Sequence, residues 1–263
     1  MRFFGLFLFS LFLCNSVFSQ EKPSVIHIAF EDVANPPRIM NSIRNSHSKL
    51  PGLTLELLSL IEKKLNVEFE FTRTPWARCK VLLKSNIADG IFHASYKKER
   101  EKFGVYPKLN GRIDASRSVF FRNYAVYVRS DSEAYIEDGQ LKNVDGTVSA
   151  KIGYSVISDL EKNGLEVDSV KKISNGLDMV SVGRVSAFVD LEEMTDAYIA
   201  QNNSKYPNLK KMKIPYRTKA YYLIFSKEFY AKNKKLTEQI WDALAEISSS
   251  AEFIKIRHKY LLM

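Results

Sequence analysis

The side chains that could do chemistry are spread along this chain and form no catalytic motif. The four histidines, His27, His47, His93 and His258, lack the spacing of metal ligands. The sequence has no Gly-x-Ser-x-Gly turn, His-Glu-x-x-His helix, Cys-x-x-Cys pair or Gly-rich phosphate loop. It therefore predicts no catalytic residues, no metal site and no cofactor, and a protein that is not an enzyme.

Arg100 is of a residue type that can bind an anion. A guanidinium offers two parallel N–H donors that match the two oxygens of a carboxylate. The alternative is a solvated surface arginine, because Arg100 lies in the charged run Lys97–Lys102. Trp76 also has two interpretations: an aromatic face that stacks on a ligand, or a tryptophan packed at the edge of a core.

Net charge is the one unusual property of the composition. The 263 residues carry 39 Lys and Arg against 30 Asp and Glu, a formal charge of +9, while the 45% hydrophobic share is that of a folded protein. A basic balance favours anionic partners, but the chain has no nucleic-acid-binding motif. Lysine-rich stretches such as Lys171-Lys172 and Lys210-Lys211 are typical of solvated faces. We expect no nucleic-acid partner.

The first 19 residues have the pattern of a secretory signal peptide. Arg2 precedes an uncharged apolar run that continues to Phe18, and Gln20 is the expected first residue after cleavage. The alternative is a membrane anchor, although a spanning helix needs about 20 apolar residues. Cleavage removes Arg2, which leaves 38 Lys and Arg against 30 Asp and Glu, and it leaves Cys79 without a cysteine partner. We expect a monomer in the periplasm.

Strand and helix patterns alternate in two separate parts of the chain. The first part has strand, helix, strand, helix and strand patterns at Val25–Phe30, Leu53–Leu65, Val67–Phe71, Ala77–Ser85 and Ile87–Phe92. The second repeats this order at Val148–Ile152, a helix with capping-box spacing from Ser158, Leu165–Val170, Leu177–Val182 and Val185–Asp190. This alternation is typical of α/β lobes with parallel sheets.

The end of the chain returns to the first part. A strand pattern at residues 220–225 is followed by two helical patterns that have no βα unit of their own. We predict lobe 1 from residues 20–120 and 221–263, lobe 2 from residues 121–220, and two crossings that act as a hinge. A ligand cleft between the lobes is expected, because ligands of open α/β sheets bind beyond the carboxyl ends of the strands.

These segments together carry a family resemblance. The motifs are Pro36-Pro37, Gly52 before a helix, the Thr74–Arg78 segment, Ile87–Gly90, Tyr96–Glu101, and the ending from Leu244 to Tyr260. In their order and spacing, residues 24–261 resemble the bacterial extracellular solute-binding proteins of family 3. The resemblance implies a two-lobed type II periplasmic-binding-protein fold and a binding function.

The resemblance assigns a ligand-binding role to several residues of the first lobe. Arg100 matches the arginine that holds the α-carboxylate of the ligand, Ser95 matches a hydroxyl that hydrogen-bonds the ligand, and Trp76 matches a stacking aromatic. His93 stands where amino-acid binders often carry a small polar residue, which suggests a different ligand; a structural histidine is the alternative. Arg78 either adds a second positive group or pairs with a carboxylate.

Three further residues are candidates with an open alternative. Glu31 lies near an acidic position that helps to bind an amino group in some members. Asp190 lies one residue from the aspartate that pairs with the ligand ammonium, so it faces the cleft only if the strand register allows it. Ser158 at a helix start would present N–H groups to an anion, although capping the helix explains it equally well.

The function implied is capture of a small polar solute, an amino acid or related carboxylate, by lobe closure. The protein with its bound solute would then deliver the solute to the membrane permease of an ABC transporter. The alternatives are a ligand sensor for a membrane signalling protein and, less favoured, a dehydratase-like enzyme on the same fold, for which Glu31 or His93 would be the acid or base.

Overall fold

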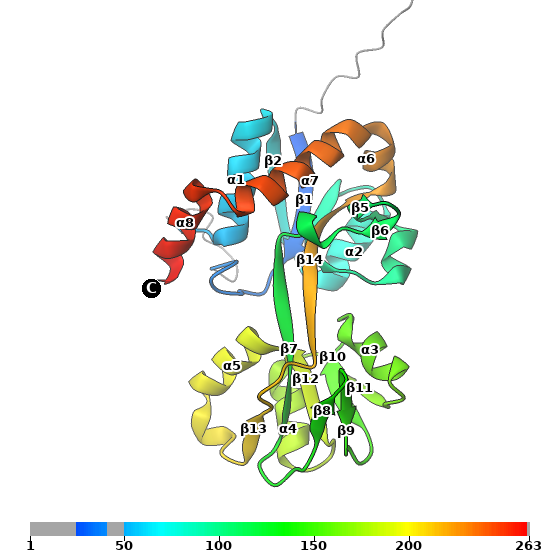
Figure 1. Ribbon diagram of the computed structural model, residues 1–263, viewed down its shortest axis with the longest axis vertical. Coiled ribbons are helices and arrows are strands. Elements are labelled where there is room, and N and C mark those ends of the chain that lie inside the picture. The colour runs from blue at the N-terminus through cyan, green and yellow to red at the C-terminus, as the bar shows by residue number, and fades with distance from the viewer. Residues whose placement is uncertain (1–24, 41–49, 262–263) are drawn as a thin grey trace, which may run out of the picture.

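The protein has two lobes joined by two long strands (Figure 1). The computed structural model describes residues 25–40 and 50–261; the predicted signal peptide lies outside them. Within these residues no helix combines the length and the apolar character needed to cross a membrane.

The first lobe contains a parallel sheet covered by helices. Its strands lie in the order β3-β1-β2. Helix α1 buries Leu57, Leu58 and Ile61 in the core of this lobe, together with Trp241 of α7, whose Nε1 donates to the Leu223 carbonyl at 2.8 Å. The elements are β1 (Val25–Glu31), α1 (Leu53–Leu65), β2 (Glu68–Thr74), α2 (Trp76–Lys84), β3 (Gly90–Ser95), the 3-10 turns η1 (Lys98–Lys102) and η2 (Ala115–Arg117), β4 (Gly104–Val105), β5 (Lys108–Leu109), β6 (Arg112–Ile113), α6 (Lys227–Lys232), α7 (Lys234–Ser248) and α8 (Ala251–Leu261).

The second lobe repeats this plan with its own sheet and core. Its parallel strands lie in the order β11-β10-β12, and Val148, Ala150 and Val189 are fully buried there. The elements are β8 (Tyr135–Glu137), β9 (Gln140–Lys142), β10 (Val148–Lys151), α3 (Val156–Lys162), β11 (Val167–Val170), α4 (Ile173–Ser181), β12 (Ala187–Leu191), α5 (Glu192–Gln201), the 3-10 turn η3 (Asn203–Lys205) and β13 (Leu209–Lys211).

Two antiparallel strands, β7 (Phe120–Arg129) and β14 (Arg217–Ser226), run through both lobes. Strand β7 pairs with β12 of the second lobe, and β14 pairs with β3 of the first, so the two sheets are continuous. Side chains on these two strands can therefore line the space between the lobes.

Most of the elements predicted from the sequence are confirmed, including the return of the last two helices to the first lobe. Strand β3 begins at Gly90 instead of Ile87, because Asn86 adopts a left-handed conformation (φ 56°) and the chain turns there. Helix α5 was not predicted, since of its residues only Thr195 is buried and the apolar period is weak.

The helix predicted to start at Ser158 starts earlier, and the capping-box assignment is wrong. Helix α3 begins at Val156 with Ser155 at the N-cap position, so Ser158 lies inside the first turn. The Ser155 hydroxyl makes no capping hydrogen bond because it contacts the other lobe, as described below.

Candidate ligand site between the lobes

A small cavity lies where the two lobes and the two long strands meet. About 20 Å³ is free inside it, room for about one water molecule. The lobes are therefore closed on one another in this structure. The residues that line the cavity come from lobe 1, lobe 2 and both long strands: Glu31, Trp76, His93, Ser95, Arg100, Arg122, Tyr124, Tyr154, Leu191 and Tyr221.

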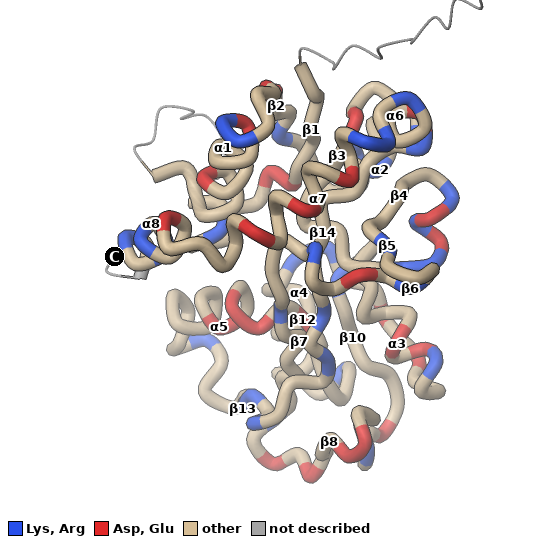
Figure 2. The backbone as a smooth tube through the Cα atoms, turned by 45° about the horizontal axis from the view of Figure 1, so that its top comes forward, with Lys and Arg blue, Asp and Glu red and all other residues tan. Residues whose placement is uncertain are grey.

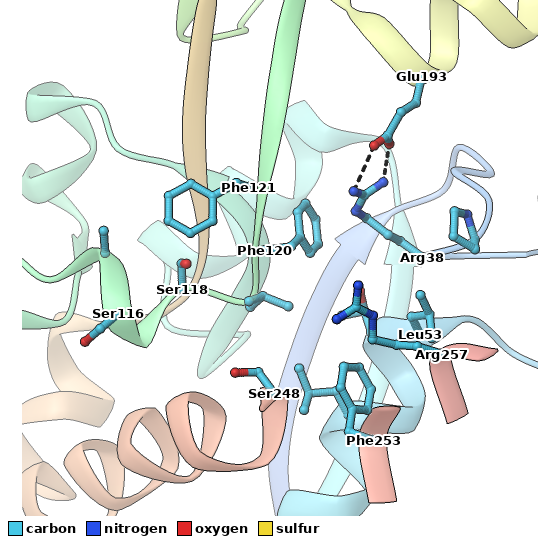
Figure 3. A pocket seen from close by; sticks show the side chains of 15 residues that line it. Arg38, Leu53, Ser116, Ser118, Phe120, Phe121, Glu193, Ser248, Phe253 and Arg257 are labelled. Carbon is cyan, nitrogen blue, oxygen red and sulfur yellow. Dashed lines mark hydrogen bonds and ion pairs between the residues drawn. The ribbon is translucent and has the colours of Figure 1, made fainter. Parts of the chain in front are cut away.

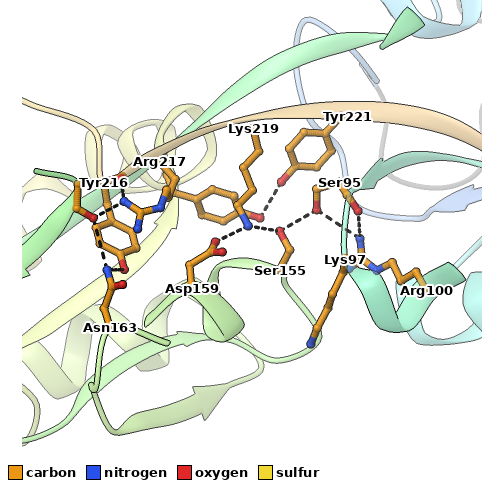
Figure 4. Close-up of polar contacts among 12 residues, drawn as sticks. Ser95, Lys97, Arg100, Ser155, Asp159, Asn163, Tyr216, Arg217, Lys219 and Tyr221 are labelled. Carbon is orange, nitrogen blue, oxygen red and sulfur yellow. Dashed lines mark hydrogen bonds and ion pairs between the residues drawn. The ribbon is translucent and has the colours of Figure 1, made fainter. Parts of the chain in front are cut away.

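Arg100 is buried, with 4% of its surface exposed, because η1 turns it back under the end of β3. Its Nη1 donates to the Ser95 carbonyl at 2.5 Å (Figure 4). Its Nη2 donates across the cleft to the Gly153 carbonyl at 3.1 Å. The neighbouring carboxylates of Glu99 and Glu101 pair with lysines instead. Among the described residues, Arg100 thus has neutral acceptors only, an incomplete environment for a buried cation.

Trp76 packs against this guanidinium. It is the first residue of α2, and the Arg100 Cζ lies 5.4 Å from the centre of its ring. Because Trp76 also lines the cavity, its face is shared between Arg100 and the space available to a ligand.

Two serines join the lobes beside the cavity, and Ser95 lines it. Ser95 at the end of β3 donates to the Ser155 hydroxyl at 2.8 Å, and Lys219 of β14 donates to the same hydroxyl at 3.1 Å (Figure 4). Lys219 also forms an ion pair with Asp159. Ser155 therefore connects lobe 1, lobe 2 and a long strand.

Arg122 enters the cavity from β7. It has 5% of its surface exposed, its Nη2 donates to Asn35 Oδ1 at 3.1 Å, and its guanidinium lies 5.7 Å from the Tyr221 ring centre. Within the described part of the chain nothing accepts a hydrogen bond from Arg122 Nε. Burial raises the pKa of the Glu31 carboxyl, and the positive charges of Lys151 and Arg122 oppose that rise.

His93 lines the cavity, but its ring is held by contacts with other residues of the protein. It adopts a left-handed conformation (φ 64°), a hydrogen bond of 2.9 Å joins its Nε2 to Thr54 Oγ1, and its ring lies edge-on to Phe92 and Phe120. Burial, with Arg122 and Arg38 adding repulsion, holds its pKa well below the usual value. The imidazole is therefore neutral at pH 7.

Asp190 and Leu191 alternate across strand β12. Leu191 pairs with Tyr124 and lines the cavity, whereas Asp190 pairs with Ala125 on the opposite face and does not line it. Asp190 accepts from Thr195 Oγ1 at 3.2 Å, and its Oδ1 has no hydrogen-bond partner among the described residues. An apolar side chain thus occupies the strand end that faces a ligand.

The remaining two predicted residues lie outside the cavity. Arg78 is exposed on α2, and Ser158 lies on α3 behind the Ser155 contact. Sequence reasoning therefore placed five of its candidates at the cavity wall: Glu31, Trp76, His93, Ser95 and Arg100. It missed Arg122, although an arginine between the apolar residues of a strand was a signal that could have been followed.

A larger cavity of about 780 Å³ lies elsewhere, between α1, α7, α8 and the start of β7 (Figure 3). It shares no lining residue with the small cavity. At its wall Arg38 and Glu193 point toward each other and form two hydrogen bonds, so this ion pair links lobe 1 to α5 of lobe 2. The small cavity is the candidate ligand site, because the buried Arg100 guanidinium there has no anionic partner among the described residues.

Comparisons with known proteins agree with this geometry. Solved structures of the same fold include a mutant of ArgBP from T. maritima (19% identity, 91% of this chain and 96% of the other covered, TM-score 0.64). They also include a histidine kinase sensor domain with similarity to periplasmic binding proteins (17%, 90% and 96%, 0.64). A third is the GluR0 ligand-binding core from Nostoc punctiforme in complex with (L)-glutamate (18%, 89% and 98%, 0.61).

The fold is that of the type II periplasmic binding proteins, as predicted. A search of curated protein sequences gives no match. The family model of the bacterial extracellular solute-binding proteins, family 3, matches residues 26–263, which is nearly all of the described chain. This match agrees with the two lobes, the two connecting strands and the inter-lobe cavity of the structure. The chain belongs to the bacterial extracellular solute-binding proteins of family 3.

Proposed function

We propose that this protein captures a small solute with a carboxylate, an amino acid or a related acid, between its lobes in the periplasm. The observation that carries the proposal is the Arg100 guanidinium, which is buried at the cavity wall and has, in the part of the chain that the structure describes, neutral acceptors only. A ligand carboxylate would complete its environment with two charge-assisted hydrogen bonds. The ligand-binding contributions of Trp76, Ser95 and Glu31 are part of the same proposal.

Binding requires the lobes to move apart and then to close around the ligand less tightly than in this structure, because the cavity here has room for about one water molecule only. We propose residues 20–120 and 221–263 as one moving body and residues 121–220 as the other, after removal of residues 1–19. Closure is then a shift between two states that the ligand drives by binding the closed state better.

The loaded protein is proposed to dock on the permease of an ABC transporter and to release its solute unchanged. Support comes from the family and from a neighbour of the same fold described as the substrate-binding protein of an amino acid ABC transporter. Presentation to a membrane sensor is the second candidate, supported by the histidine kinase sensor domain. Loss of uptake of the identified ligand in a deletion strain would favour transport, and loss of a transcriptional response with normal uptake would favour sensing.

The test of the binding proposal is an Arg100→Gln variant assayed by calorimetry against amino acids and small organic acids. Truncating a buried charged hydrogen-bond partner costs about 3–5 kcal/mol, so the affinity should fall by at least 100-fold. Arg78→Gln is the matched control, because Arg78 is exposed and lies outside the cavity. Equal affinities of the two variants would remove Arg100 from the site, and conversion of the ligand during the titration would refute the non-enzymatic proposal.

A further inference from the structure

Two arginines line the same small cavity. Arg100 comes from η1 of the first lobe and Arg122 from the long strand β7, and both are at least 95% buried. Taking a guanidinium out of water is costly unless an anion and hydrogen-bond acceptors replace the solvent. Both arginines therefore need a compensating negative charge near the cavity.

The protein supplies Arg122 with only part of this compensation. Its Nη2 reaches the neutral Asn35 side chain, and its closest carboxylate, Glu193, lies 3.8 Å away. That carboxylate already accepts two hydrogen bonds from Arg38. Arg122 Nε has no acceptor among the described residues although it is buried. The buried Nε–H of Arg122, a residue that lines the cavity, is thus unsatisfied among the described residues.

The other charged groups around the cavity do not change this balance. Glu31 is the one carboxylate in its described lining. Lys151 donates to Tyr154 at 2.9 Å, and Lys219 is paired with Asp159. Asp190 is outside the lining; its buried carboxylate interacts electrostatically with Lys151 and Arg122, and its Oδ2 accepts a hydrogen bond from Thr195. The charged wall facing a ligand is therefore two guanidiniums against one carboxylate.

This balance disfavours a ligand of zero or positive net charge. An ammonium group in the cavity would meet Glu31 and two cations, whereas a second carboxylate would accept from the Arg122 Nε, which has no acceptor among the described residues. We propose that the solute is a small acid with two carboxylates, of which Arg100 binds one and Arg122 the other. This inference rests on the proposed function. Arg122 is then the residue that selects an acid over its amide.

The experiment compares acids with amides of the same shape. Calorimetry would measure L-glutamate against L-glutamine, and glutarate and succinate against their monoamides. The acid should bind at least 30-fold more tightly than its amide in the wild-type protein. In Arg122→Gln this ratio should fall to about threefold or less, because the loss affects the acid alone. Arg122→Lys keeps the charge and should keep much of the preference, which separates a charge effect from misfolding.

Arg129→Gln is the matched control, because Arg129 is an exposed arginine on the same strand and pairs with Asp131. Amides that bind as tightly as their acids to the wild-type protein would overturn this inference and leave the proposed function standing. A wild-type preference that survives Arg122→Gln would overturn the role of Arg122. If no carboxylate binds at all, the proposed function fails together with this inference.

Discussion

At the scale of single residues, the basic side chains Arg100 and His93 both line the cavity but differ in charge: Arg100 is charged and His93 is neutral. A guanidinium keeps its charge in proteins, so a buried one such as that of Arg100 needs an anion or several hydrogen-bond acceptors around it. His93 does not bury a charge, because burial and the nearby Arg122 and Arg38 lower its pKa and the ring stays neutral. The neutral ring still keeps its contact with Thr54, which fits a structural role.

The lowered pKa of His93 makes stability depend on pH in a defined direction. Below the ordinary histidine pKa of 6.5 the unfolded chain binds a proton that the folded chain refuses, so stability present above pH 6.5 is lost as the pH falls. The loss should approach about 1.4 kcal/mol per pH unit. His93→Asn, which tolerates the left-handed backbone, should lose less between pH 6.5 and 5 in urea titrations. Parallel curves for the two proteins would contradict a buried neutral His93.

At the scale of elements, one glycine fixes how the segment after β1 meets α1. Gly52 is the N-cap of α1 with φ +125°, and its N–H donates to the Tyr260 hydroxyl of α8 at 3.0 Å. A Cβ at this position would lie 2.2 Å from the Arg38 carbonyl oxygen. Gly52 thereby also positions its neighbours Arg38 and Thr54. Arg38 forms the ion pair with Glu193 of the second lobe, and Thr54 makes the hydrogen bond to His93 at the small cavity.

Gly52→Ala should therefore destabilise the protein by about 3–5 kcal/mol, because backbone strain and a collision with backbone atoms add together. Gly111→Ala is the control: its φ is also positive at +77°, but no atom lies within 4 Å of the new Cβ. That variant should lose about 1–2 kcal/mol. Chemical denaturation measures both, and equal losses would show that the contact with Arg38 relaxes freely.

At the scale of the whole molecule, polar contacts join the two lobes. Those between described residues include Arg38 with Glu193, Ser95 with Ser155, and Arg100 with Gly153. Polar contacts of this kind are expected of an interface that must open. The basic charge plays no comparable part: Lys and Arg are interspersed with Asp and Glu along both lobes (Figure 2), which is typical of solvated faces.

Removing one of these contacts should shift the ligand-free protein toward an open state. Glu193→Gln weakens the ion pair with Arg38, so the open-to-closed ratio should rise by about fivefold, or about 1 kcal/mol. The radius of gyration from small-angle X-ray scattering should increase accordingly. Glu192→Gln is the control, because Glu192 is held by Lys211 and Asn123 within the second lobe and β7. The same radius for both variants would show that this ion pair does not hold the lobes closed.

The sequence by itself determined the architecture and one half of the cavity wall. Hydrophobic periodicity is a local property, so it predicted the βα order, and the family resemblance carried by segments such as Pro36-Pro37, Gly52 and Tyr96–Glu101 implied the lobe 1 site residues. Only the tertiary structure decided the other half. Arg122, Ser155 and Leu191 meet the lobe 1 residues because β7 and the second lobe close over them, and the β12 register turned Asp190 away. A local pattern specifies an element, but the side chains that share a cavity depend on packing between segments far apart in the chain.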